Sequence, residues 1–139
     1  MGLDELEHHA SSRSHAIDDG LVRAAVQLLR ELPTSATSSV LLATDLQATN
    51  VLAARREPWL VIDPKPHVGD PAYDPVQHIL NCLARAAPDP QALVDRMASL
   101  TGVDAERLRL WLFVRCVQAS VNPGYAWPET AEVASRTAP

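Results

Sequence analysis

The sequence predicts a mainly helical α+β domain that contains a short β-hairpin. Apolar residues recur at helical spacing through residues 18–32 and through most of residues 74–136. Two short apolar runs, residues 50–54 and 59–62, flank the polar turn Arg-Arg-Glu-Pro, which is typical of a hairpin. With 139 residues, of which 47% are hydrophobic, the chain has the size and apolar content of one domain with one core.

This single unit, residues 1–139, divides into three parts. Residues 1–16 show little hydrophobic period, and we expect them to form a loose or partly helical arm. Residues 40–74 are short apolar runs joined by polar loops: residues 40–42 predict a short buried strand, and residues 64–73 predict a loop that is too proline-rich for a helix or a central strand. Residues 74–139 are expected to be helical.

Each helix is expected between a capping residue and a breaker. Asp18 precedes a helix that ends before Pro33. Asp74 can cap a helix that continues to Pro88, with a proline in its first turn. The other predicted helices are residues 91–100, closed by Gly102, a helix from the cap Asp104 to about residue 120, and residues 129–136.

The charge balance excludes some classes of partner. Twelve basic residues against 17 acidic ones give a net charge of −5, and no block of Lys or Arg is present. Proteins that bind nucleic acid carry clustered basic surfaces, so no nucleic-acid partner is expected, and a cationic small molecule is favoured. The N-terminus lacks the apolar stretch of a signal peptide and no run approaches 18 apolar residues, so we expect a cytoplasmic protein without membrane association.

The cysteines and two aromatic residues are expected to be structural. Cys82 and Cys116 lie in apolar helical patterns without a Cys-x-x-Cys motif or neighbouring histidines, which predicts buried free thiols and not a disulfide or a zinc site. Trp111 and Phe113 fall in the same kind of pattern and are expected in the core and at its boundary.

Three polar residues have the spacing of a kinase catalytic loop. Residues 41–52 read Leu-Leu-Ala-Thr-Asp-Leu-Gln-Ala-Thr-Asn-Val-Leu, so Asn50 follows Asp45 by five positions. Asp63 ends the second strand of the hairpin, which places it beside Asn50. Phosphoryl transfer requires an Asp that accepts a hydroxyl proton and oxygen ligands that hold magnesium, and these residues supply both. The alternative is a chance placement of three loop residues.

The stretch from residue 40 to residue 81 also resembles a known family. Its motifs are Thr-Asp-Leu-Gln-Ala-Thr-Asn-Val-Leu at 44–52, Val-Ile-Asp-Pro-Lys at 61–65 and Gly-Asp-Pro-Ala-Tyr-Asp at 69–74. These are similar to the aminoglycoside and hydroxyurea branch of the antibiotic phosphotransferases, most of all to the streptomycin-phosphorylating enzymes. The resemblance implies the C-terminal lobe of a protein-kinase-like fold, with ATP as phosphate donor, Mg²⁺ as cofactor and a hydroxyl of an aminoglycoside-type antibiotic as acceptor.

Carried over position by position, the resemblance implies a role for each motif residue. Asp45 matches the catalytic base, Asn50 and Asp63 match the magnesium ligands, and Asp74 matches the Asp that supports the catalytic loop through its backbone. Lys65 is a candidate phosphate contact.

One of these roles has an alternative, and two neighbouring positions raise questions about the geometry of the loop. Lys65 can instead form a structural ion pair with Asp63 or Asp70. Ala43 stands where the kinase pattern has His, and Thr49 would be strained if its backbone needed a positive φ, because it is β-branched.

The residues that would cover the nucleotide are not found in this sequence. Its five glycines are scattered and form no Gly-x-Gly-x-x-Gly motif, so we expect a truncated form without the N-terminal nucleotide lobe. The hairpin, residues 50–62, should then expose apolar area and allow self-association through that face. Three interpretations stay open: a truncated antibiotic phosphotransferase, an inactive remnant or small-molecule-binding domain, and an enzyme whose other lobe is a separate chain.

Overall fold

The computed structural model describes residues 3–10, 17–122 and 128–139, and it confirms a mainly helical fold with small antiparallel sheets. Part of the predicted N-terminal arm is helical, whereas residues 11–16 of that arm lie outside the described residues. None of the described helices is long and apolar enough to cross a membrane. In chain order the elements are α1 (Leu3–Ala10), α2 (Asp19–Glu31), β1 (Val40–Leu42), the 3₁₀ turn η1 (Ala48–Asn50), β2 (Val51–Ala53), β3 (Trp59–Val61), β4 (His67–Gly69), α3 (Tyr73–Leu80), α4 (Leu83–Ala86), α5 (Pro90–Thr101), α6 (Ala105–Val121) and α7 (Thr130–Thr137).

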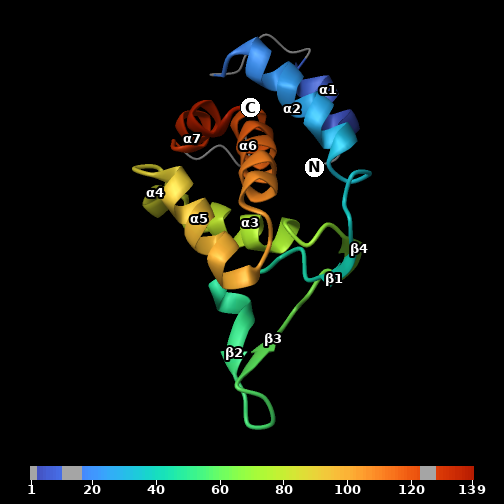
Figure 1. The fold of residues 1–139 in the computed structure, drawn as a ribbon, viewed down its shortest axis with the longest axis vertical. Helices are drawn as coiled ribbons and strands as arrows, with labels where there is room; N and C mark the ends of the chain where they lie inside the picture. Colours follow the sequence, from blue (N-terminus) through green and yellow to red (C-terminus); the bar gives the residue numbers. More distant parts are fainter. Residues whose placement is uncertain (1–2, 11–16, 123–127) are drawn as a thin grey trace.

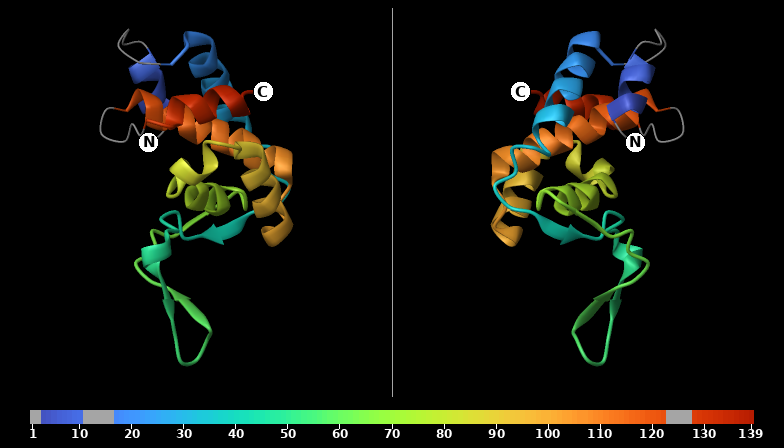
Figure 2. Two further views of the ribbon diagram at one scale, coloured as in Figure 1. Left: turned by 90° about the vertical axis from the view of Figure 1, so that its left-hand side faces the viewer. Right: turned by 90° about the vertical axis from the view of Figure 1, so that its right-hand side faces the viewer.

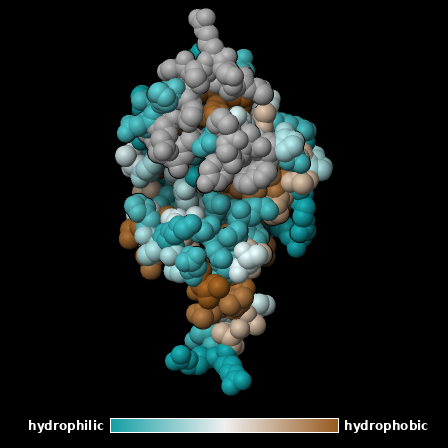
Figure 3. Space-filling model, turned by 180° about the vertical axis from the view of Figure 1, so that it is seen from behind, coloured by the Kyte–Doolittle hydropathy of each residue, from teal (hydrophilic) through white to brown (hydrophobic). Residues whose placement is uncertain are grey.

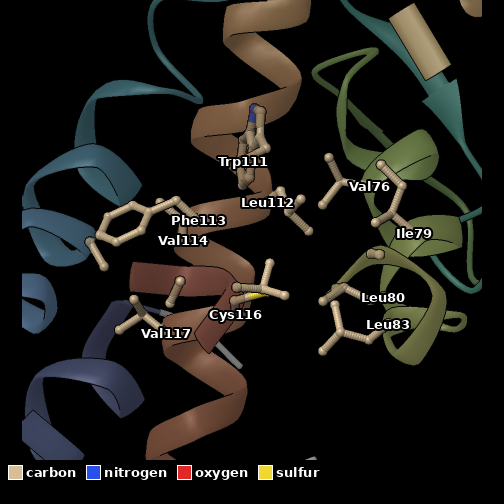
Figure 4. Packing of buried hydrophobic residues seen from close by; sticks show 14 of the residues in the cluster. Val76, Ile79, Leu80, Leu83, Trp111, Leu112, Phe113, Val114, Cys116 and Val117 are labelled. Atoms are coloured by element: carbon tan, nitrogen blue, oxygen red, sulfur yellow. The ribbon is translucent and has the colours of Figure 1, made fainter. Parts of the chain in front are cut away.

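Helix α6 lies at the centre of the helical body, where it contacts α1, α2, α3, α5 and α7 (Figure 1). It is apolar on most of its circumference, as expected of a helix inside a protein. In Figure 4, side chains of α3 and α4 point toward α6 and fill the space between them. The labelled residues of this cluster are Val76, Ile79, Leu80, Leu83, Trp111, Leu112, Phe113, Val114, Cys116 and Val117.

Local signals set the helix ends as predicted. The Asp18 carboxylate accepts from the Gly20 amide at 2.7 Å at the start of α2, and the Asp104 carboxylate accepts from the Arg107 amide at 2.8 Å at the start of α6. Gly102 closes α5 in the left-handed conformation, with φ of 72°, which glycine adopts without a steric penalty.

The helix predicted from Asp74 to Pro88 is instead two helices, α3 and α4. The Cys82 amide bonds to the Ile79 carbonyl, three residues back, at 3.0 Å. The Cys82 backbone then leaves the helical region, with φ of −128° and ψ of 37°, before α4 begins. No local sequence signal marks this break.

The two cysteines are free but differ in burial. Cys116 is buried in α6 as expected, and burial raises the pKa of its thiol to about 12. Cys82 is only partly buried, which corrects the prediction for that residue. Trp111 and Phe113 are buried in the core as predicted.

Two separate two-stranded antiparallel sheets carry the loops. Strands β2 and β3 form the predicted hairpin, with Val51 opposite Val61. Strand β4 pairs with β1 in a two-stranded sheet, with Leu42 opposite His67, so three residues of the predicted loop at residues 64–73 form an edge strand. The prediction of a buried β1 was wrong: Leu42 is buried but Leu41 is 75% exposed, because no described element covers the outer face of this sheet.

The β2–β3 hairpin projects away from the helical body (Figure 2). In Figure 3 an apolar patch lies on the projecting hairpin, whose tip is hydrophilic. The predicted exposed apolar face is therefore confirmed, and self-association through it stays a prediction. The exposed large apolar residues of the hairpin and its end are Leu52, Trp59, Leu60, Val61 and Ile62.

Asp70 joins β4 to α6 and to the end of α2. Its carboxylate accepts from Trp111 Nε1 at 2.6 Å and from Arg107 Nε at 2.7 Å, and Arg107 also donates to the Leu32 carbonyl at 2.5 Å. Burial alone would raise the pKa of Asp70, which is 5% exposed. The hydrogen bonds from Arg107, the Ala72 amide and Trp111 outweigh burial and hold its pKa below the ordinary value.

We expect Asp70→Asn to lower the free energy of unfolding at neutral pH by about 3 to 5 kcal/mol, because Arg107 would lose its buried counter-charge. A carboxylate with a lowered pKa stabilises the fold above its ordinary pKa, and this stabilisation is lost as pH falls through the folded-state value. The difference between wild type and variant should therefore shrink in acid. Urea unfolding at several pH values measures it. Glu132→Gln, which removes the exposed pair with Arg136, is the control and should cost less than about 1 kcal/mol.

Candidate active site

Asp45 directly follows a residue in an unusual backbone conformation. Thr44 has φ of 55°, a left-handed value that is strained for a β-branched residue. Its amide donates to Asp74 Oδ1 at 2.9 Å and its hydroxyl donates to the Lys65 carbonyl at 2.5 Å. These bonds hold the strained turn and thereby fix the chain before Asp45. The strain considered at Thr49 is absent, since the described non-glycine residues with positive φ are Thr44 and Asp63.

Asp74 holds this turn from the first turn of α3. Its second oxygen, Oδ2, accepts from the Ala43 amide at 2.7 Å, so one carboxylate binds two consecutive backbone amides. The prediction that Asp74 caps its own helix was wrong: Ala72 stands at the N-cap position, without a side-chain bond. The carboxylate instead reaches a loop 30 residues earlier in the chain.

Lys65 lies against Asp45. Its Nζ is 2.8 Å from Asp45 Oδ2, and its amide donates to the Ala43 carbonyl at 2.9 Å. The structure thus pairs Lys65 with Asp45, whereas the alternative considered from the sequence was an ion pair with Asp63 or Asp70. The loop after β3 is fastened to the turn before Asp45 by both backbone and side chain.

The hairpin brings Asn50 and Asp63 to its base. The Asn50 carbonyl accepts from the Ile62 amide at 2.8 Å, so Asp63 follows the residue that pairs with Asn50. Asn50 Nδ2 donates to the Asp45 carbonyl at 3.0 Å, which turns the amide oxygen of Asn50 away from that bond. Asp63 is exposed and has φ of 49°.

These residues fit a hard cation by the chemistry of their donors. Asp63 offers a carboxylate and Asn50 an amide oxygen whose orientation the Nδ2 bond to Asp45 fixes, and magnesium takes such oxygen ligands together with phosphate and water. Across the described part of the chain, no three His, Cys, Asp or Glu side chains gather closely enough to hold a metal on their own. A cation at Asn50 and Asp63 would therefore need ligands from a bound phosphate or water.

A comparison of the sequence with protein families decides the assignment. The profile of the aminoglycoside/hydroxyurea antibiotic resistance kinases matches residues 2–124, most of the chain. The chain belongs to this family. The matched range includes both sheets, the turn at Asp45 and the hairpin base at Asn50 and Asp63.

Curated relatives match over shorter stretches. A hydroxyurea phosphotransferase of Kitasatospora aureofaciens is 42% identical over 78 residues, which are 56% of this chain and 22% of that protein. Streptomycin 6-kinases of Streptomyces griseus and Streptomyces glaucescens are 70% and 67% identical over 30 residues, 22% of this chain and 10% of each kinase. The matches thus span about a fifth or less of the length of these relatives. No solved structure matches the chain significantly.

In this family member a cavity opens beside the Lys65–Asp45 pair. It has a volume of about 740 Å³ and lies between the β1–β4 sheet and the end of α2, within the size range of ligand sites. Lys65 and Thr44 form its wall toward Asp45, and Trp111 closes it from α6. The remaining lining residues are Pro33, Ser39, Leu42, Pro66, His67, Val68, Gly69, Asp70 and Tyr73.

A cluster of buried and partly buried polar residues that was not predicted from the sequence supports this cavity. Asp70 binds Arg107 and Trp111, which stand four residues apart and therefore on one face of α6. An arginine one turn before a tryptophan on a buried helix was the available signal, because a buried guanidinium needs an anionic partner. The partner itself lies 37 residues from Arg107 and cannot be identified by spacing.

We expect Asp74→Asn to loosen the turn before Asp45. An asparagine can accept from only one of the two amides and turns an N–H group toward the other. The free energy of unfolding should therefore fall by about 1.5 to 3 kcal/mol. Hydrogen exchange at Ala43 and Thr44 should accelerate more than elsewhere. Asp89→Asn is the matched control: Asp89 accepts from the Ala92 amide at an N-cap, where asparagine serves equally well. Unchanged exchange at Ala43 and Thr44 in the Asp74 variant would contradict this role.

Proposed function

We propose that this chain carries the acceptor and metal side of a phosphotransferase site that phosphorylates a hydroxyl of an antibiotic-class small molecule with ATP. The observation that carries the proposal is the Asp74 carboxylate on the amides of Ala43 and Thr44. It fixes the turn that presents Asp45 next to Asn50. Phosphoryl transfer depends mainly on such positioning, since little covalent chemistry is left to the protein.

In this proposal Asp45 is the catalytic base. As the acceptor oxygen bonds to the γ-phosphorus, the bond from phosphorus to the bridging oxygen breaks, ADP leaves and Asp45 takes the hydroxyl proton. Lys65 binds Asp45 Oδ2, so the other carboxylate oxygen serves the acceptor, and its ammonium group offsets negative charge on the transferred phosphoryl group. Asn50 and Asp63 would hold Mg²⁺, which spreads that charge when bound.

The named relatives suggest which acceptors to test. One acts on hydroxyurea and two on streptomycin by their names, and both compounds carry hydroxyl groups that a base can deprotonate. We propose that the acceptor enters through the cavity of about 740 Å³ beside Lys65, because Lys65 lines that cavity and also binds Asp45. We further propose that this chain is the C-terminal lobe of a kinase-like fold and that the nucleotide binds on the side of the projecting hairpin, at whose base Asn50 and Asp63 lie.

Transplanting residues 41–74 into the Streptomyces griseus streptomycin 6-kinase tests the catalytic roles. We expect the graft to phosphorylate streptomycin and Asp45→Asn within it to lower kcat by at least about a hundredfold, the usual range for removing a catalytic base. Glu57→Gln at the exposed hairpin tip is the charge-matched control and should leave kcat unchanged. An inactive graft, or an Asp45 variant as active as the Glu57 variant, would refute the proposal.

Metal binding can be measured on the chain itself, independently of turnover. Mn²⁺ shares the oxygen preference of Mg²⁺ and can be titrated by its paramagnetic signal in the presence of ATP. We expect Asp63→Asn to weaken Mn²⁺ binding by about tenfold or more, because even the mutation of residues that only support metal ligands lowers metal affinity by this factor. Asp95→Asn on exposed α5 is the control. Equal weakening in both variants would show that Asp63 is not a ligand.

A further inference from the structure

A second cavity lies away from Asp45, between α3–α4 and α5. It has a volume of about 340 Å³, near the lower end of the range for small-molecule sites. Its apolar lining comes from Ile79 on α3 and from Leu93, Met97 and Leu100 on α5. Leu100 is 72% exposed, so apolar surface continues from the cavity onto the rim.

The polar lining of this groove is entirely basic. It consists of Arg85, Arg96 and His78, with the thiol of Cys82, and no acidic side chain lines it. Neither Arg85 nor Arg96 has an ion pair or a side-chain hydrogen bond within the described residues. Both arginines are exposed at the rim of the groove, whereas the partly buried Arg107 is paired with Asp70.

Two unpaired guanidinium groups beside an apolar cleft favour one kind of ligand. Carboxylates bind guanidinium groups with paired, charge-assisted hydrogen bonds, and an alkyl or aryl body can fill the apolar part of the groove. The chain has a net charge of −5, which repels an anion at long range, so binding of such a ligand depends on the local charge of Arg85 and Arg96. A cationic molecule finds no counter-charge among the lining residues.

We propose that the groove between α3–α4 and α5 binds a small amphipathic monocarboxylate. The carboxylate lies between Arg85 and Arg96, and the apolar body lies against Ile79, Leu93 and Met97. This site does not depend on the phosphotransferase proposal, because none of its residues belongs to the turn at Asp45 or to the hairpin.

Titration of the whole chain with octanoate tests the site. We expect saturable binding, with the largest NMR shifts at the methyl groups of Ile79, Leu93 and Met97. The double variant Arg85→Gln/Arg96→Gln should bind about tenfold more weakly or worse, as expected when hydrogen bonds to a charged group are lost. Octylammonium, which has the same alkyl chain and the opposite charge, should not bind there.

The hairpin supplies a matched control variant. Arg55 and Arg56 are also exposed, adjacent in sequence and close to the exposed apolar residues of β3, but they line neither this groove nor the cavity beside Lys65. Arg55→Gln/Arg56→Gln should therefore leave octanoate binding unchanged. Absence of saturable binding, equal binding of octylammonium, equal loss in the two double variants, or shifts confined to the hairpin would each overturn the proposal. Should the groove variant fail to fold, the pattern of shifts in the wild-type chain decides.

Discussion

The carboxylate of Asp74 binding two consecutive backbone amides is the constraint on which the arrangement at Asp45 depends. Successive N–H groups that point to one anion form a concave binding site made of backbone, and here the anion is part of the protein. The bonds offset the cost of the positive φ at Thr44, which places Asp45 beyond a sharp turn. Without that carboxylate, nothing else described in the chain would hold both amides.

A second carboxylate on the same short segment connects this turn to the hydrophobic core. Asp70 is held by Arg107 and Trp111 of the central helix. Asp74, four residues after Asp70, holds the turn before Asp45. The segment from Asp70 to Asp74 is therefore fixed at one end by a buried ion pair, and its other end restrains the turn before Asp45. Residues placed on a rigid support keep their geometry better than residues on free loops.

The helical body and the β2–β3 hairpin differ in how far they bury their apolar residues. The helical body surrounds α6 and buries its apolar side chains, whereas the hairpin projects with its apolar residues exposed. A two-stranded hairpin is marginal by itself in water, so the bonds at its base, from Ile62 to Asn50 and from Asn50 to Asp45, matter for its position. The catalytic candidates lie at this junction and not in the core.

The sequence alone determined what depends on neighbouring residues. The caps at Asp18 and Asp104, the glycine stop at Gly102 and the hairpin between residues 50 and 62 follow from short-range chemistry, and the structure confirms them. The spacing of Asp45 and Asn50 was likewise visible in the sequence, and so was the relation to a family of kinases.

Only the tertiary structure decided the partners of the charged residues. Asp74 has the sequence context of a helix cap, yet its carboxylate serves a loop 30 residues away. Lys65 pairs with Asp45 and not with the carboxylates that are nearer in sequence. Strand β4 pairs with β1 although its proline-rich surroundings favour a loop. Such contacts join segments distant along the chain, and their geometry depends on how the helices pack around α6, which local propensity does not encode.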